Sequence, residues 1–289
     1  MDRVKKRKVD VLIISDVHLG TYGCHAKELL FYLKSIRPKK VILNGDIIDV
    51  WQFSKKYWPK SHTRVVRHLM GWISKGIKTY YVTGNHDEVF RKFEGFKLGA
   101  LQVVNKIVLD VGENEKAWIF HGDVFDVTMQ HSKWLAKLGA VGYDTLILIN
   151  RLVNFLSEKI FKKGKISLSK KIKNSVKSAV KFINNFEVTA ADIGISQQFN
   201  YVICGHIHHP EHKIISNSEG YIQYLNSGDW VENLTALELN DGVWRIYRFD
   251  DKEKQKMLAE ESIDDSELNT GSLFNNMLQE FKLMKIPVA

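Results

Sequence analysis

Short apolar runs alternate with amphipathic stretches along the first third of the chain. The runs are bounded by Gly, Asp or Asn and predict buried strands over residues 9–15, 41–44 and 79–83. The stretches between them place apolar residues on one face and predict helices over 25–36 and 63–75. This alternation predicts βαβ units and a mostly parallel sheet covered on both faces, with ligands at the carboxyl ends of the strands.

The rest of the chain predicts a second set of strands, arranged as an antiparallel meander. These strands are expected over residues 103–109, 118–120, 201–204, 221–225, 235–239 and 243–249. Residues 125–198 carry long helical patterns, and we expect a helical insertion there, acting as a lid or a membrane-facing cap. The insertion interrupts a predicted domain over 1–250, and an acidic appendage is expected over 251–289.

Composition narrows the class of protein. The 289 residues allow one large or two modest domains, and Cys24 and Cys204 are too few for a disulfide scaffold. No apolar run is long enough to span a bilayer or to serve as an export signal. A cytoplasmic protein is therefore expected. Its net charge of +9 favours a polyanionic partner such as phosphate, nucleic acid or an anionic membrane.

Five polar clusters follow predicted strands. They are Asp16-Val17-His18, Gly45-Asp46-Ile47-Ile48-Asp49, Gly84-Asn85-His86-Asp87, His121-Gly122-Asp123 and Gly205-His206-Ile207-His208. Any one of them alone is explained equally well as a polar turn in which Asp caps backbone amides. Together they hold five of the 11 histidines, which favours one shared site over five unrelated turns.

The donor set of these clusters is carboxylate, imidazole and amide without thiolate, which favours a hydrolytic site for Mn²⁺, with Fe or Zn²⁺ as alternatives. The donors are too many for one ion, so we expect two divalent ions bridged by Asp46. Asp16, His18 and His208 are assigned to one ion. Asn85, His121 and His206 are assigned to the other.

Such a centre attracts phosphate and provides a hydroxide near neutral pH. His86 is then the expected general acid for the leaving oxygen, with Asp87 orienting it. The alternative is a histidine that only supports a metal ligand. Signatures of P-loop, serine-esterase and zincin enzymes are absent from the sequence.

In this order, the five clusters resemble the calcineurin-like metallophosphoesterase superfamily. That resemblance implies a four-layer α/β/β/α sandwich with the metal site between the carboxyl ends of two sheets. A narrower resemblance to the UDP-2,3-diacylglucosamine pyrophosphatase group is carried by the helix at Trp134-Leu135 and by the runs Ser167–Lys170, Cys204–Pro210 and Asn226–Val231. It implies hydrolysis of a nucleotide-linked glycolipid to UMP and a lipid monophosphate, in lipid A biosynthesis.

Nine lysines and no acidic residue lie between residues 159 and 181. On a helix, Lys170, Lys173 and Lys177 fall opposite an apolar face, which makes them candidates for binding the substrate or the inner face of the cytoplasmic membrane. A solvated lysine face is an equally good explanation. Nucleic acid is disfavoured as the partner of this segment, because the segment lacks the Arg and interleaved aromatic residues that usually accompany base stacking.

The sequence thus predicts a two-metal phosphohydrolase that cleaves a pyrophosphate or phosphoester bond. The first alternative is a soluble phosphodiesterase or phosphatase that acts on nucleotides or phosphoproteins. The second is a metal-free scaffold that binds a partner or a membrane.

Overall fold

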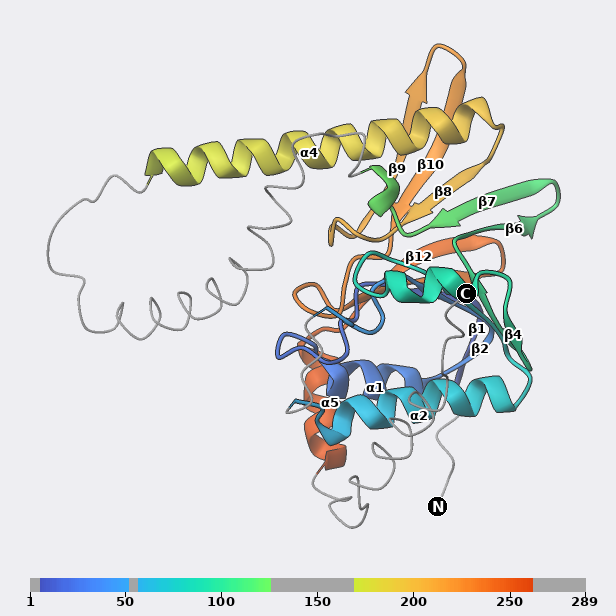
Figure 1. Cartoon of the computed structure of the whole chain (residues 1–289), viewed down its shortest axis with the longest axis vertical. Helices are drawn as coiled ribbons and strands as arrows, with labels where there is room; N and C mark the ends of the chain where they lie inside the picture. Colours follow the sequence, from blue (N-terminus) through green and yellow to red (C-terminus); the bar gives the residue numbers. More distant parts are fainter. Residues whose placement is uncertain (1–5, 52–56, 126–168, 262–289) are drawn as a thin grey trace, which may run out of the picture.

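Two β-sheets lie face to face, and helices cover both outer faces (Figure 1). The computed structural model describes residues 6–51, 57–125 and 169–261, apart from the side chains of 169–180 and 260–261. Separate apolar cores lie between each sheet and its helices and between the two sheets. The predicted four-layer α/β/β/α sandwich is confirmed.

The larger sheet has seven strands in the order β12-β11-β1-β2-β3-β5-β4. Their bounds are β1 Arg7–Ile14, β2 Ile36–Asn44, β3 Lys78–Val82, β4 Lys97–Leu98, β5 Leu101–Val104, β11 Thr235–Asn240 and β12 Val243–Arg248. Strands β1, β2, β3 and β5 are parallel, as the alternating pattern predicts. The helices α1 (Ala26–Ser35) and α2 (Lys60–Ser74) cover the outer face of this sheet.

Strand β1 shows why the first apolar run has no polar side. Leu12 and Ile14 face the helices α1 and α2, while Val11 and Ile13 face the second sheet. All four side chains are buried. A strand covered on both faces loses the apolar and polar alternation of a half-exposed strand and becomes a continuous apolar run.

The smaller sheet has five strands in the order β6-β7-β8-β10-β9. Their bounds are β6 Lys106–Gly112, β7 Glu115–Phe120, β8 Tyr201–Cys204, β9 Glu211–Asn217 and β10 Gly220–Asn226. The helix α4 (Ser169–Ser196) covers its outer face through Phe186, Ala190 and Ala191. In Figure 1 the N-terminal part of α4 extends beyond the sheet.

The prediction of an antiparallel meander in the second half is wrong in three respects. First, β7, β8 and β10 are parallel neighbours: α4 lies in the connection from β7 to β8, and the chain passes through the edge strand β9 between β8 and β10. Second, the expected strand over 103–109 is two strands in different sheets, separated at Asn105. Third, β11 and β12 join the larger sheet, where β11 pairs antiparallel with β1.

Shorter elements complete the described chain. The 3-10 helices η1 (Glu88–Phe93) and η2 (Asp123–Phe125) follow β3 and β7, and α5 (Asp251–Glu261) contacts α1 and buries Met257. No helix within the described residues has the length and apolarity needed to cross a membrane. Most of the predicted insertion and appendage, residues 126–168 and 262–289, lies outside the described residues, so the domain boundaries stay a prediction.

His62 joins α2 to the loop that follows β1. Its side chain is buried, and its Nδ1 accepts a hydrogen bond from the Gly20 amide at 2.9 Å. Burial lowers the pKa of His62 from 6.5 to about 4. As the pH falls from 6.5 to about 4, the unfolded chain binds a proton that the folded chain does not, so stability falls.

We expect the free energy of unfolding to fall by up to about 1.4 kcal/mol per pH unit in this range because of His62. Urea denaturation at several pH values measures the slope, and His62→Gln should reduce it. The exposed His212→Gln is the matched control and should leave the slope unchanged. Equal slopes for wild type and His62→Gln would contradict the assignment.

Candidate metal centre

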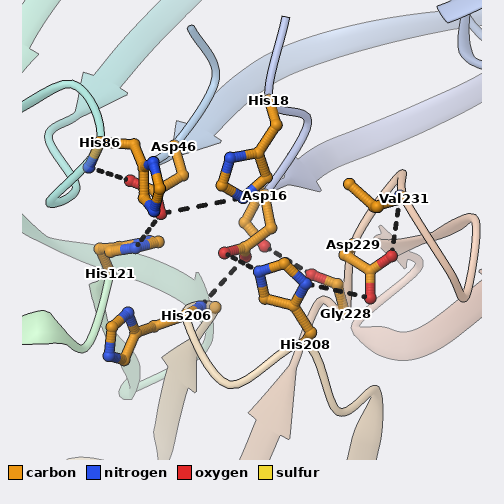
Figure 2. Close-up of polar contacts among 12 residues, drawn as sticks. Asp16, His18, Asp46, His86, His121, His206, His208, Gly228, Asp229 and Val231 are labelled. Atoms are coloured by element: carbon orange, nitrogen blue, oxygen red, sulfur yellow. Dashed lines mark hydrogen bonds and ion pairs between the residues drawn. The ribbon is translucent and has the colours of Figure 1, made fainter. Parts of the chain in front are cut away.

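Loops from both sheets bring His86 and six of the seven predicted metal ligands together at the carboxyl ends of the strands (Figure 2). They carry Asp16 and His18 after β1, Asp46 after β2, Asn85 and His86 after β3, His121 after β7, and His206 and His208 after β8. These strands belong to two different sheets, so the site lies where the sheets meet.

Main-chain hydrogen bonds fix the loops to one another. The amides of Val17 and His18 both donate to the Asp46 carbonyl, at 3.0 and 2.9 Å. The His206 amide donates to Asp16 Oδ2 at 3.0 Å, which joins the two sheets. The site is therefore built by the backbone as well as by side chains.

Five site residues have left-handed backbone conformations. The φ angles are 50° at Asp16, 53° at His18, 54° at Asp46, 67° at His206 and 51° at His208. Each such residue other than glycine costs about 1–3 kcal/mol and persists only where its surroundings hold it. Clustered strain of this kind points to a functional site.

Two glycines allow the loops to approach closely. A Cβ atom at Gly84 would overlap Asp46 Oδ1. One at Gly205 would lie 2.6 Å from Asp16 Oδ2. Glycine is needed at both positions because the carboxylates occupy the space that a side chain would fill.

The side-chain donors form groups with the spacing of metal ligands. One donor atom each from Asp16, His18 and His208 lies within 4.8 Å of the others, as the sequence predicts for one ion. Asp46, His121 and His206 form a second such group. His18, Asp46 and His86 form a third, so Asp46 belongs to two of the three groups. The structure thus brings together six of the seven predicted ligands, and the seventh, Asn85, follows β3 at the same edge of the larger sheet.

Several of these donors are buried and make no hydrogen bond. They are Asp16 Oδ1, His18 Nε2, Asn85 Oδ1 and His121 Nε2. Asp16 Oδ1 and His121 Nε2 have ion-pair contacts within the site, at 3.2 Å to His208 Nε2 and to Asp46 Oδ2. Buried polar atoms nearly always have a partner, so donors that have none, or only another donor of the same site, suit a bound cation. Carboxylate, imidazole and amide donors fit a divalent ion.

The buried carboxylates of the site favour positive charge next to them. Burial alone would raise the pKa of Asp16, but His208 and His121 outweigh it and lower that pKa to about 2. Burial would likewise lower the pKa of His208, but Asp16 and Asp229 raise it to about 9. Buried carboxylates therefore draw protons onto the imidazoles. A divalent ion would satisfy the same carboxylates and release those protons.

Sequence reasoning assigned no role to two carboxylates that hold the imidazoles. Asp49 Oδ2 lies 3.2 Å from His18 Nδ1, and Asp229 Oδ2 lies 3.6 Å from His208 Nδ1. Contacts of this kind orient the other ring nitrogen toward a metal. Asp49 was detectable as the last residue of the cluster Gly45–Asp49. Asp229 lies in the run Asn226–Val231, which supported the narrower family resemblance but was not considered as part of the metal site.

The surroundings of His86 and Asp87 differ from the prediction. His86 Nδ1 pairs with Asp49 Oδ2 at 2.8 Å, so Asp49 orients it. Asp87 is buried and accepts hydrogen bonds from the amides of Ile47 and Gly84, at 3.0 and 2.6 Å. It also accepts one from the Tyr81 hydroxyl at 2.6 Å. Asp87 therefore holds the loops after β2 and β3 in place.

Lys170, Lys173 and Lys177 lie in the N-terminal part of α4. Their side chains fall outside the described residues, so their role in binding substrate stays a prediction.

The calcineurin-like phosphoesterase family model matches residues 9–210. The UDP-2,3-diacylglucosamine hydrolase of Aliivibrio fischeri is 25% identical over 82% of this chain and 98% of its own length. The enzyme of the same name from Blochmanniella pennsylvanica is 24% identical over 81% of this chain and 93% of its own length. The DNA double-strand break repair protein Mre11 of Methanococcus maripaludis is 28% identical over 75% of this chain and 56% of its own length.

The family match extends from β1 to the residues just after His208, and therefore covers all seven predicted metal ligands. Buried donors gathered at the junction of two sheets agree with it. The chain belongs to the calcineurin-like phosphoesterase family and is a metal-dependent phosphohydrolase.

Proposed function

We propose that this protein hydrolyses the pyrophosphate bond of a UDP-linked diacylated sugar in lipid A biosynthesis, releasing UMP and a lipid monophosphate. The observation that carries the proposal is the similarity to UDP-2,3-diacylglucosamine hydrolases, which extends over nearly the whole length of those relatives. The donor groups of the candidate metal centre support a hydrolase of this chemistry.

In this proposal Asp46 would serve both of two divalent ions, Mn²⁺ by preference, with Fe or Zn²⁺ as alternatives. Asp16, His18 and His208 hold one ion, and Asn85, His121 and His206 hold the other. When bound, the ions would lower the pKa of a water molecule and stabilise the charge that develops on phosphorus.

His86 serves as the general acid for the leaving oxygen. Burial would lower its pKa, but the side chain of Asp49, which is not a proposed metal ligand, lies 2.8 Å from Nδ1 and is the first of the causes that raise the pKa. A proton is therefore available near neutral pH. Because Asp49 holds Nδ1, the proton to be donated is the one on Nε2.

The lysine-rich part of α4 places the enzyme on the inner face of the cytoplasmic membrane. An anionic surface attracts each nearby lysine by about 1 kcal/mol. The acyl chains of the proposed substrate lie in that membrane, so the same surface brings enzyme and substrate together.

The proposed function is tested with full-length protein dialysed against Mn²⁺. Purified protein should contain two ions and hydrolyse UDP-2,3-diacylglucosamine to UMP. Asp46→Asn should lose metal and reduce turnover by more than about 100-fold. The control is Asp110→Asn, which removes an exposed carboxylate on β6. Metal content is measured by inductively coupled plasma mass spectrometry.

The other possible results of these assays favour the alternative functions. Hydrolysis of bis-p-nitrophenyl phosphate without hydrolysis of the UDP-linked lipid would favour a soluble phosphodiesterase. A protein without metal or turnover would favour a scaffold. An Asp46→Asn variant with full metal content and turnover would end the two-metal assignment.

His86→Gln tests the general acid. An alkyl alkoxide needs a proton to leave, while p-nitrophenolate does not, so the variant should hydrolyse methyl esters of UMP about 100-fold more slowly or worse. Hydrolysis of the p-nitrophenyl ester should change by less than about 10-fold. Equal losses for both esters, at unchanged metal content, would contradict the role.

The membrane proposal is tested by changing Lys170, Lys173 and Lys177 together to Gln. Binding to vesicles of phosphatidylglycerol should weaken by about 3 kcal/mol, or more than about 100-fold. Lys92, Lys97 and Lys106, which are exposed on the phosphoesterase domain, form the matched control triple. Co-sedimentation measures the binding, and equal losses from the two triples would count against a specific role of α4.

A further inference from the structure

An exposed tryptophan lies directly beside the proposed general acid. The Trp51 side chain is 56% exposed, and its ring centroid lies 4.8 Å from that of His86 at an interplanar angle of 39°. The His86 ring also lies 4.7 Å from that of His18, one of the proposed metal ligands. The His86 ring thus contacts both Trp51 and the proposed metal ligand His18.

Backbone hydrogen bonds hold the two residues that precede Trp51. The amide of Val50 donates to the His86 carbonyl at 3.0 Å. The amide of Asp49 donates to the Leu19 carbonyl at 2.9 Å, and the Asp49 carboxylate holds His86. Residues 49 and 50 are therefore attached both to the loop after β1 and to the loop after β3. The indole is carried by the same framework that carries the candidate catalytic groups.

Packing does not account for the position of this side chain. Tryptophan is among the most buried residues on average, and Trp230, Trp244 and Trp72 in this protein are buried. Trp51 and the neighbouring Val50 are exposed instead, at 56% and 39%. Exposed apolar surface at the edge of a reaction site is typical of ligand binding.

The chemistry of the indole indicates the class of ligand. Its flat apolar surface stacks on other planar rings, and stacking of a nucleobase on an aromatic side chain contributes about 1–3 kcal/mol. A nucleotide places its base one sugar away from its phosphate. A phosphate bound at the metal centre would thus leave the base of the same nucleotide within reach of Trp51.

We infer that Trp51 is the platform on which the nucleobase of the substrate stacks while its phosphate lies at the metal centre. The inference deepens the proposed function and rests on it, since it requires a nucleotide-linked substrate. It assigns to Trp51 the recognition of the base. The metal ligands then recognise only phosphate.

Binding of UMP and of ribose 5-phosphate to the Mn²⁺-loaded full chain tests this inference, because the two ligands share a sugar phosphate and differ in the base. Isothermal titration calorimetry gives both dissociation constants. Wild type should bind UMP about 10-fold more tightly or better, which is the value of one stacked base. Trp51→Ala should lower that ratio to about 2-fold or less, and Trp51→Phe should keep most of it.

Tyr221→Ala is the matched control, since it removes an exposed aromatic ring from β10. It should leave the ratio unchanged. A Trp51→Ala variant that keeps the wild-type ratio, or a wild type that binds both ligands equally, would overturn the inference. Both results leave the hydrolysis assay intact, so failure of the inference is distinguishable from failure of the proposed function. Equal affinity of Trp51→Ala and wild type for ribose 5-phosphate shows that the variant is folded.

Discussion

Two buried carboxylates set the conditions for the rest of the site. Asp16 and Asp46 are 0% and 2% exposed, and a charge removed from water needs a partner of opposite sign. Burial opposes the charged form of both, yet the surrounding imidazoles lower both pKa values. The same attraction raises the pKa values of His121 and His208. A pair of divalent ions meets this requirement with neutral imidazoles. The carboxylates thus make cation binding part of the stability of the fold as well as of its chemistry.

The fold brings these groups together at the cost of local strain. Parallel strands end at the same edge, and the face-to-face sheets bring the ends of β1, β2 and β3 near those of β7 and β8. The loops must then turn sharply toward one another, which explains the left-handed conformations at Asp16, Asp46 and the other site residues. Each costs about 1–3 kcal/mol. The apolar cores on both sides of the larger sheet offset that cost, because they hold the strand ends in place.

Local patterns in the sequence predicted individual strands and the donor residues that follow them. Apolar runs identified β1, β2 and β3, and the polar residues after them identified the donors. The pairing of strands that are far apart in the sequence could not be predicted from these local patterns. The apolar run from Val103 to Leu109 is continuous, although the chain passes from one sheet to the other at Asn105. Strand β9 was missed because Glu211, His212 and Lys213 interrupt its apolar pattern. The partner of His86 was misassigned because Asp87 is adjacent in sequence, while Asp49 becomes adjacent only when the loops after β2 and β3 meet.

The metal centre by itself does not select a substrate. Metal ions held there would bind phosphate, a group common to lipids, nucleotides and nucleic acids, and the relatives of this chain include a DNA repair protein as well as two UDP-2,3-diacylglucosamine hydrolases. Selectivity must come from residues that surround the centre without contacting the metal. Two such regions differ in character. Trp51 offers a flat apolar surface close to His86, and α4 carries a lysine-rich segment that extends beyond the smaller sheet. A substrate with a base at one end and acyl chains in an anionic membrane at the other would bring its base to Trp51 while the membrane surface contacts the lysines, whereas a simple phosphodiester offers neither feature.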